Sequence, residues 1–449
     1  MTANPTKVLE EAHQLHRSCQ MSQALATYQH YLSMRPADAQ AWSELGGLLL
    51  ELNRPQEARE ACSKAVRLDR SNVNAQVNLA RCLDQKGDGA QACSILEALI
   101  SQDPANPHAN GLLVKILAGR GDWEAFGKAM HRFIGLQNHP PAIDAYEKGL
   151  LDLRLGIMPR GWARYESRLQ CPGLIGPERN FPQDPWDGGS FKGKTLLVHY
   201  EQGLGDTFMF VRYAARVKAL GGRVLLEVQP ALADVVATCP GVDEVVPHGS
   251  PLPPFDLQIP LLSLPWIFQT DLQNIPAEVP YLGIPERVPN RQRIRHLLSA
   301  SEDRIRIGLA WAGSPGHKRD LDRSIPPACF APLACLPEVA WYSFQLGATE
   351  EPPLAGLVSL DPSIRNFSDT AYALTGMQLI ITVDTALAHL AGALGIPTIL
   401  LVAFFPDFRW LMDREDSPWY PTLRIYRQST PGDWTGVIQR LLTDLQGDM

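Results

Sequence analysis

The run Glu201-Gln202-Gly203-Leu204-Gly205-Asp206 decides the fold of the larger part of this chain. It follows the apolar residues 195–200, which predict a buried parallel strand, and it precedes residues 207–213, which predict the start of a helix. A strand, a glycine turn and a helix form a corner of an open α/β sheet, where ligands bind outside the carboxyl ends of the strands. The acid of this turn, Asp206, is therefore a candidate catalytic base.

Strand and helix patterns alternate through the rest of the chain. After the opening corner, strands are expected at 223–228, 242–246 and 256–260, with a helix at 231–239 and a basic helix within 285–301. A second series of strands is expected at 306–311, 339–345, 379–383 and 398–402. The pattern predicts two Rossmann-like halves, 195–300 and 301–449, with a ligand cleft between their strand ends.

Before these halves, residues 1–170 show self-similarity with a period of 34 residues. One repeat contains Trp42, Leu45, Gly46, Leu49, Ala58 and Ala65, and the next contains Gln76, Leu79, Ala80, Leu83, Ala92 and Leu99. This pattern resembles the tetratricopeptide repeat, a pair of helices with small residues at their close crossing. A fourth unit has Phe126 where alanine is expected, and a degenerate pair at 141–170 is expected to cap the array. Such arrays bind a peptide or partner protein, or serve as a structural or oligomerising arm.

Residues 171–194 are rich in proline and glycine and predict a linker or an extended wrap, anchored by Trp186. Within this stretch, residues 188–195 satisfy the P-loop pattern G-x-x-x-x-G-K-T. A phosphate-binding loop needs a strand before it and a helix after it, whereas here a proline-rich linker precedes and a strand follows. The match is therefore discounted. A dinucleotide fingerprint beginning at Gly203 is also weakened, because Phe208 stands at its third glycine position.

A second corner follows the strand expected at 379–383. It reads Asp384-Thr385-Ala386-Leu387-Ala388-His389. The helix that begins here presents free amides and the positive end of its dipole, which suit a phosphate or pyrophosphate group. His389 lies four residues after Thr385, on the same helix face. The alternatives are that Asp384 only caps the helix and that His389 is structural.

A third cluster, 317–324, carries His317, Lys318, Arg319, Arg323 and Ser324 at another strand end. Basic and hydroxyl groups there suit phosphate oxygens, although a solvated loop has the same composition. The D-x-D sequence at 320–322 matches a metal motif of another fold. Its basic neighbours would offset the negative charge that a metal needs, so no metal is expected.

Charge, hydropathy and cysteine content indicate which partners and which compartment are expected. The formal net charge of −7 and the lack of a long basic run argue against a nucleic-acid partner. No signal peptide is evident, and the apolar region 379–405 is interrupted by Asp384, His389 and Pro397, so no membrane span is expected. Eight cysteines without a C-x-x-C pair indicate buried thiols in a reducing compartment, hence the cytoplasm.

Together the corners resemble glycosyltransferases of the GT-B fold, in particular the heptosyltransferase family (glycosyltransferase family 9). Bacterial proteins that join tetratricopeptide repeats to such a domain also look similar near 409–420. The resemblance implies that Asp206 is the catalytic base, and that Arg323, in place of a lysine, faces the donor diphosphate with Ser324. It assigns donor binding to Asp384, Thr385, Ala386 (in place of glycine) and His389. The loop residues Glu201, Gln202, Gly203 and Gly205 are expected to orient the acceptor or hold the turn.

The activity implied is metal-independent, inverting transfer of a sugar from a nucleotide-diphospho-sugar to an acceptor hydroxyl, with no cofactor. The repeats would recruit the peptide, protein or glycan acceptor, or a partner. A non-catalytic repeat scaffold with a relic nucleotide-binding domain is the alternative from another class, and a sugar-nucleotide epimerase shares the two-half architecture. The sugar, the nucleotide base and the acceptor stay open.

Overall fold

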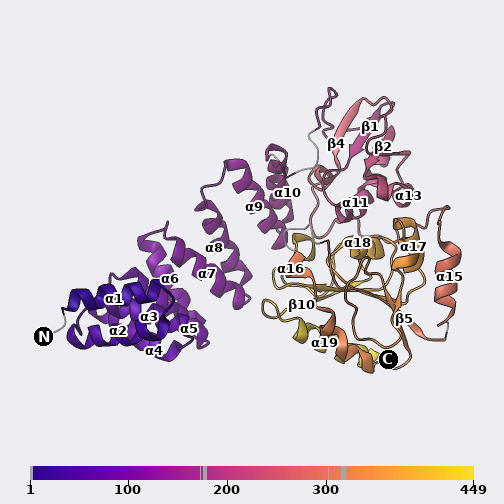
Figure 1. Cartoon of the computed structure of the whole chain (residues 1–449). Coiled ribbons are helices and arrows are strands. Elements are labelled where there is room, and N and C mark those ends of the chain that lie inside the picture. Colours follow the sequence, from indigo (N-terminus) through magenta and orange to yellow (C-terminus); the bar gives the residue numbers. More distant parts are fainter. Residues whose placement is uncertain (1–3, 172, 175–178, 302, 315–319, 449) are drawn as a thin grey trace. The chain divides into compact units, whose positions relative to one another are not determined.

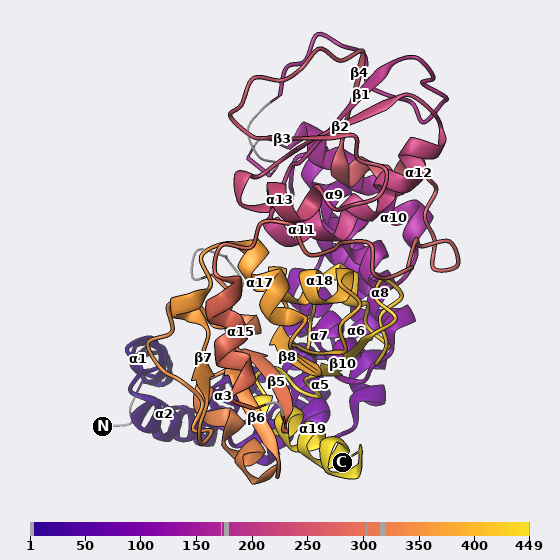
Figure 2. The same ribbon diagram turned by 90° about the vertical axis from the view of Figure 1, so that its right-hand side faces the viewer.

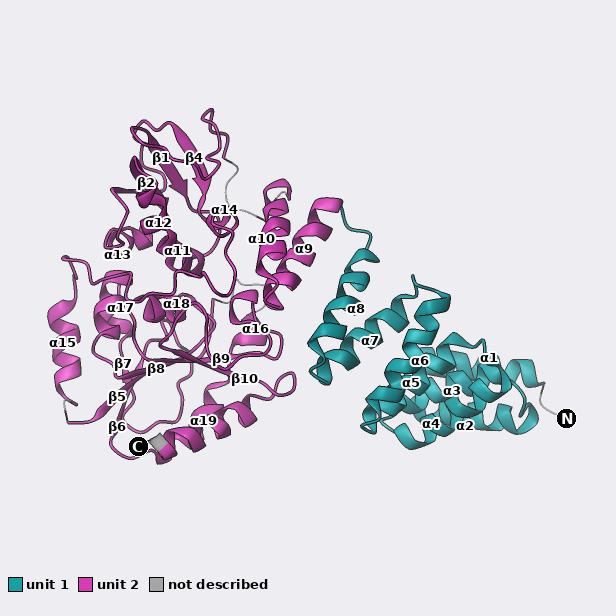
Figure 3. Cartoon of the chain, turned by 180° about the vertical axis from the view of Figure 1, so that it is seen from behind, with its two compact units in different colours: residues 1–140 teal, residues 141–449 magenta. Residues whose placement is uncertain are grey.

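The structure, a computed structural model, describes residues 4–171, 173–174, 179–301, 303–314 and 320–448. They divide into two compact units, Met1–Pro140 and Pro141–Met449 (Figure 3). The first unit is helical, and the second contains two parallel sheets with flanking helices (Figure 1). The predicted fold class, helical repeats followed by paired α/β halves, is confirmed.

Unit 1 is built from antiparallel helix pairs. The pairs are α1 (Pro5–Arg17) with α2 (Met21–Met34), α3 (Ala39–Glu51) with α4 (Pro55–Leu68), α5 (Val73–Gln85) with α6 (Gly89–Gln102), and α7 (Pro107–Gly119) with α8 (Trp123–Gly135). The first helices α3, α5 and α7 contact one another in succession. The fourth pair forms although Phe126 replaces alanine, because this ring is buried within the unit.

The 34-residue period appears in the N-cap residues of the helices as well as in the buried core residues. Asn4, Asp38, Asn72 and Asn106 follow one another at the 34-residue period, and each accepts a hydrogen bond from a backbone amide of the helix it caps. At the α3–α4 crossing, a β-carbon on Gly46 would lie 2.3 Å from Cys62 Sγ. The small residues of the pattern are therefore required by the close approach of the two helices.

The helices after Pro140 belong to unit 2, so the first compact unit ends earlier than the expected boundary at 170. These are α9 (Pro141–Arg154), α10 (Met158–Tyr165) and the 3₁₀ helix η1 (Glu166–Gln170). Trp162 is buried, with edge-on contacts to Phe210, Phe408 and Trp419 of the α/β part. This aromatic packing joins the pair to the α/β core instead of making it a cap of the repeat array.

The first α/β half has a parallel sheet of order β3-β2-β1-β4. Its strands are β1 (Thr195–His199), β2 (Arg223–Val228), β3 (Glu244–Pro247) and β4 (Leu257–Pro260), with Leu197 opposite Leu225. The associated helices are α11 (Leu204–Phe210), α12 (Ala214–Ala219), α13 (Ala233–Val236), α14 (Leu264–Ile267) and the 3₁₀ helices η2 (Val211–Tyr213), η3 (Pro230–Leu232) and η4 (Leu261–Ser263). Helix α11 begins three residues before the expected start, so Gly205 and Asp206 lie in its first turn.

The described end of the linker extends this sheet. Pro185 forms a parallel bridge with Gln258 of β4, and the amide of Trp186 donates to the carbonyl of Gln258 at 2.8 Å. The Trp186 ring is buried against Phe191 and Phe268, which makes it the expected anchor. Residues 188–195 lead into strand β1 and not into a helix, as the rejection of a phosphate-binding loop required.

The second half has a parallel sheet of order β10-β9-β8-β5-β6-β7. Its strands are β5 (Ile305–Ala310), β6 (Val339–Ser343), β7 (Val358–Ser359), β8 (Leu379–Val383), β9 (Thr398–Val402) and β10 (Leu423–Arg427). The other elements are α15 (Arg291–Ser299), α16 (Asp320–Arg323), α17 (Phe367–Leu374), α18 (Ala386–Ala393), α19 (Trp434–Asp448) and the 3₁₀ helices η5 (Pro327–Cys335), η6 (Asp361–Ser363) and η7 (Phe408–Trp410). The edge strands β7 and β10 were not predicted, since a two-residue strand leaves no pattern and β10 carries exposed Arg424.

The two halves meet through helices at their facing strand ends. Helix α11 contacts α18, and α13 contacts α17 (Figure 2). Helix α15 precedes the expected boundary at 300 but packs on α17 of the second half. Within the described part of the chain, no helix combines the length and apolar character needed to cross a membrane.

Candidate active site

A cleft of about 800 Å³ lies where the two predicted corners meet. Its walls come from the N-terminal turns of α11 and α18 and from the strand ends of the second sheet. Most of the predicted site residues line it: Gly203, Gly205, Asp206, Arg323, Asp384, Thr385, Ala386 and His389. The tertiary structure therefore brings the two predicted corners to one cavity.

Asp206 lies in the first turn of α11, with 14 % of its side chain exposed. Its Oδ2 accepts the amide of Gly203 at 2.7 Å, and its Oδ1 is ion-paired with Nη2 of Arg409. Burial raises the pKa of Asp206 above its ordinary value, and the charge of Arg409 opposes that rise. Both oxygens of this carboxylate are therefore occupied, one by a backbone amide and the other by a guanidinium.

Arg409 is a cleft residue that the sequence prediction did not assign to the site. It lies in η7 with 9 % of its side chain exposed, and its Nη1 donates to Asp407 Oδ1 at 2.5 Å. The segment 409–420 also carries Trp410, Trp419 and Tyr420, all buried, while Asp413, Glu415 and Asp416 between them are exposed. The number of aromatic residues in this segment was the available signal that it enters the core.

His389 packs directly on the first corner. Its Nδ1 is 2.9 Å from the hydroxyl of Tyr420, and its ring stacks on Trp410 at 5.2 Å between centroids. Burial, reinforced by the nearby charge of Arg409, lowers the pKa of His389 to about 3. The imidazole is therefore neutral near pH 7 and can offer a phosphate a hydrogen bond, not a charge.

Asp384 precedes helix α18 and does not cap it; Thr385 is the N-cap residue, and its side chain makes no capping hydrogen bond. Burial and the neighbouring carboxylate of Asp407 raise the pKa of Asp384 to about 6. Ala386 is the first residue of the helix, so the free amides of the first turn face the cleft as expected.

Arg323 contacts the second corner from the loop that follows strand β5. Its Nη1 donates to the backbone carbonyl of Asp384 at 2.8 Å, and its Nε donates to Asp320 Oδ1 at 3.1 Å. Ser324 Oγ accepts the amide of Gly313 at 3.1 Å, which ties this loop to the end of β5. Arg323 therefore lies beside the α18 N-terminus, while Ser324 supports the loop and does not line the cleft.

Glu201 and Gln202 lie outside the cleft lining. Glu201 is buried and receives both Nε (3.1 Å) and Nη2 (2.8 Å) of Arg168 in η1, as well as the amide of Leu262. The carbonyl of Gln202 accepts Gln229 Nε2 at 2.8 Å. Of the two roles expected for these residues, this geometry fits holding the turn.

The basic residues His317, Lys318 and Arg319 lie outside the described residues. Asp320, from the D-x-D sequence, pairs with Arg323. Across the described ranges, no group of three or more His, Cys, Asp or Glu side chains is arranged to hold a metal ion. Metal independence remains a prediction.

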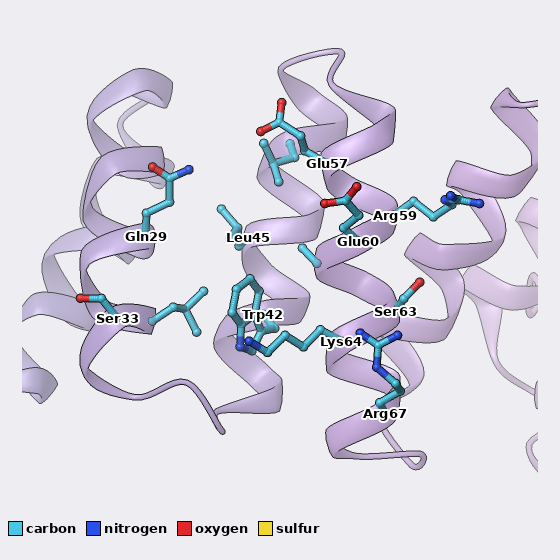
Figure 4. A pocket seen from close by; sticks show the side chains of 13 residues that line it. Gln29, Ser33, Trp42, Leu45, Glu57, Arg59, Glu60, Ser63, Lys64 and Arg67 are labelled. Carbon is cyan, nitrogen blue, oxygen red and sulfur yellow. The ribbon is translucent and has the colours of Figure 1, made fainter.

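A second cavity, of about 740 Å³, lies in the repeats among α2, α3 and α4. Figure 4 shows Trp42 and Leu45 on α3 between Gln29 and Ser33 of α2 and the charged side chains of α4. The Lys64 ammonium lies 4.1 Å from the centre of the Trp42 ring, and Trp42 Nε1 donates to the carbonyl of Pro36. Acidic Glu57 and Glu60 and basic Lys64 and Arg67 occupy opposite ends of this groove.

Fold and site together define a class: tetratricopeptide-type helical repeats followed by two Rossmann-like halves that share one cleft. Residues 4–148 match the family described as the cytochrome c-type biogenesis protein H TPR domain. Protein FlbA of Caulobacter vibrioides is 25 % identical over 452 residues, covering 93 % of this chain and 74 % of that protein. Human protein O-mannosyl-transferase TMTC3 is 43 % identical over 72 residues, which cover 16 % of this chain and 7 % of that protein.

Two solved structures each align with about half of the chain. A glycosyl transferase family 9 protein from Veillonella parvula aligns with a TM-score of 0.42 and 12 % identity, covering 54 % of this chain and 88 % of its own. ADP-heptose lps heptosyltransferase II of E. coli aligns with a TM-score of 0.39 and 14 % identity, covering 56 % and 98 %. The fold assignment itself rests on the two parallel sheets and their facing strand ends.

Proposed function

We propose that this protein transfers a sugar from a nucleotide-diphospho-sugar to an acceptor hydroxyl, with inversion and without a metal. The observation that carries the proposal is the juxtaposition of Asp206 with the N-terminus of α18 and Arg323 in one cleft. A base on one wall and anion-binding groups on the other are the two requirements of this reaction.

In this reaction the acceptor oxygen attacks the anomeric carbon of the donor while Asp206 takes the hydroxyl proton. The bond between the anomeric carbon and the phosphate oxygen breaks, and its electron pair leaves with the nucleoside diphosphate. The amides of the first turn of α18, Arg323 and the neutral His389 stabilise the charge that develops on the diphosphate. Closure of the two halves would exclude water and limit hydrolysis of the donor.

The repeats would recruit the acceptor or a partner protein. The groove around Trp42 suits a short segment with an apolar side chain over Leu45 and Trp42, a basic group toward Glu60, and an acidic group toward Lys64. Glu57 is already paired with Arg54. The eight cysteines are all free thiols, which supports a reducing compartment such as the cytoplasm.

A thermal-shift screen of the full chain with ADP, GDP, UDP and CDP tests the donor assignment, since a bound nucleotide stabilises the folded state by mass action. Nucleotide sugars of the base that binds are then tested for turnover in the presence of candidate acceptors. Stabilisation by one nucleoside diphosphate followed by sugar transfer supports the proposal. The absence of any shift with all four would contradict it.

The alternative function is a repeat scaffold whose α/β part binds a nucleotide without turning it over. One observation favours it: both carboxylate oxygens of Asp206 are already engaged. A chain that binds a nucleotide sugar but never releases a nucleoside diphosphate from it would support this alternative.

A further inference from the structure

We infer that Arg409 is a donor-responsive switch: its guanidinium pairs with Asp206, as in this structure, and moves to the diphosphate when the donor binds. The inference rests on the proposed function and names how the same site is regulated. While Arg409 is paired with Asp206 the base is masked, so the acceptor hydroxyl is deprotonated only when a donor is present.

Charge in the cleft supports an exchange of this kind. Among the described lining residues, the carboxylates are Asp206, Asp322, Asp384 and Asp407, and the guanidiniums are Arg323 and Arg409. Arg323 already donates to Asp320 and to the carbonyl of Asp384. A diphosphate entering this acidic cleft needs a further cation, and Arg409 is the other guanidinium that lines it.

The contacts of the Arg409 guanidinium would allow it to exchange one partner and keep the other. Its two terminal nitrogens bond different carboxylates, Asp206 from the first half and Asp407 from its own loop. Its Nε is buried without a hydrogen-bond partner, so the guanidinium is incompletely satisfied in this arrangement. An incoming phosphate oxygen would compete with Asp206 for one side of the fork while Asp407 retains the other.

Backbone strain lies next to this residue. Leu411, two positions further along the chain, has φ of 52° and ψ of −177°, a conformation that residues with a β-carbon rarely adopt. Leu411 and its neighbour Trp410 are both buried, so this strained position lies within the core next to the cleft. Relief of that strain would favour a second position of the loop once the ion pair with Asp206 is broken.

The consequence for Asp206 is release of one oxygen. When Arg409 leaves, Oδ1 becomes free to accept the acceptor proton while Oδ2 keeps the amide of Gly203. After transfer the proton passes from Asp206 to solvent, the nucleoside diphosphate departs, and Arg409 returns to the carboxylate. Donor hydrolysis would then be limited, because the base is exposed only in a cleft that the donor already fills.

A double-mutant cycle on diphosphate binding tests the exchange without requiring turnover. Inorganic pyrophosphate is titrated by calorimetry into the full-length wild type, Asp206→Asn, Arg409→Met and the double variant. We expect Asp206→Asn to tighten binding about tenfold and Arg409→Met to weaken it by a similar factor. The gain from Asp206→Asn should shrink in the Arg409→Met background, since no guanidinium is left to be freed.

If Asp206 only repels the anion, Asp206→Asn should improve pyrophosphate binding more in the Arg409→Met background than in wild type. The reason is that an unpaired Asp206 repels the anion more strongly once Arg409 is gone. An equal or larger gain in the Arg409→Met background, or no pyrophosphate binding to wild type and Asp206→Asn, would overturn the inference. Arg409→Lys, which keeps the positive charge, serves as a second variant in case Arg409→Met fails to fold. Arg414→Gln is the matched control: it removes the surface pair with Asp416 in the same segment and should bind pyrophosphate as wild type does. Wild-type pyrophosphate binding without any sugar transfer would contradict only the proposed function.

Discussion

Gly205 and His389 lie in direct contact across the two halves: a β-carbon on Gly205 would be 2.7 Å from Cδ2 of the imidazole. The imidazole ring cannot easily move away from Gly205, because it stacks on Trp410 and forms a hydrogen bond with the hydroxyl of Tyr420. Because Gly205 has no side chain, α11 and α18 can approach closely enough for one cleft to contain both predicted corners.

Gly205→Ala should therefore separate α11 from α18. Overpacking of this kind costs about 1–3 kcal/mol of the free energy of unfolding, measured by urea denaturation. Gly447→Ala is the matched control, since nothing lies within 4 Å of that β-carbon and the helix gains propensity. The double variant Gly205→Ala with His389→Ala should be less destabilised than the sum of the single variants; strict additivity would show that the two residues do not compete for space.

Replacement of Asp206 tests the base. In an assay that detects sugar transfer, Asp206→Asn and Asp206→Ala should lower kcat about 100- to 10,000-fold, because the acceptor proton loses its positioned carrier. The KM for the donor should not rise, since this carboxylate repels the diphosphate. Turnover at the wild-type rate in Asp206→Asn would remove the residue from the mechanism.

Arg323 is expected to bind the donor diphosphate. Arg323→Gln should weaken binding of the nucleoside diphosphate about 10- to 100-fold, the usual cost of losing a charge-assisted hydrogen bond. Titration calorimetry measures it, with Arg293→Gln on the exposed face of α15 as the control arginine. A dissociation constant unchanged in Arg323→Gln would show that the phosphates bind elsewhere.

Asp384 should make the stability of the α/β unit depend on pH. The pKa of its carboxyl is about 6 in the folded chain and 3.8 ordinarily, so the folded state favours the protonated form. The stabilising effect of that proton is complete below about pH 4 and is lost as the pH rises through 6. Asp384→Asn should therefore be more stable than wild type by about 3 kcal/mol at pH 7.5 and nearly equal to it at pH 3.5. Denaturation at both pH values measures this difference, and an equal effect at both would contradict the assignment.

The division at Pro140 predicts which fragments fold. A fragment 141–449 should unfold cooperatively and bind the same nucleoside diphosphate as the full chain. A fragment 171–449 lacks Trp162 and Arg168, and so loses an aromatic core residue and the partner of buried Glu201. Removal of such a core tryptophan alone costs about 3–5 kcal/mol, so this fragment should unfold at a markedly lower temperature in a thermal melt. Equal melting temperatures would show that α9 and α10 are dispensable.

Much of the fold could be predicted from local pattern. The repeat period and most central strands were found, because a small residue at a helix crossing and an apolar run of a buried strand are required by neighbours close in sequence. The repeat-to-core boundary was placed too late because helices α9 and α10 retain an amphipathic pattern whichever unit they pack against. Edge strands β7 and β10 were missed for want of a continuous apolar run.

The two corners, with Asp206 and the Asp384–His389 segment, were determined by the sequence itself, since a strand followed by a small-residue turn specifies its own local geometry. Only the tertiary structure decided what those residues face. Arg409 pairs with Asp206 from 203 positions away, and the imidazole of His389 is neutral because the burial that lowers its pKa exists only after the halves pack together. Charge pairing and desolvation depend on distances in space, which no local pattern encodes.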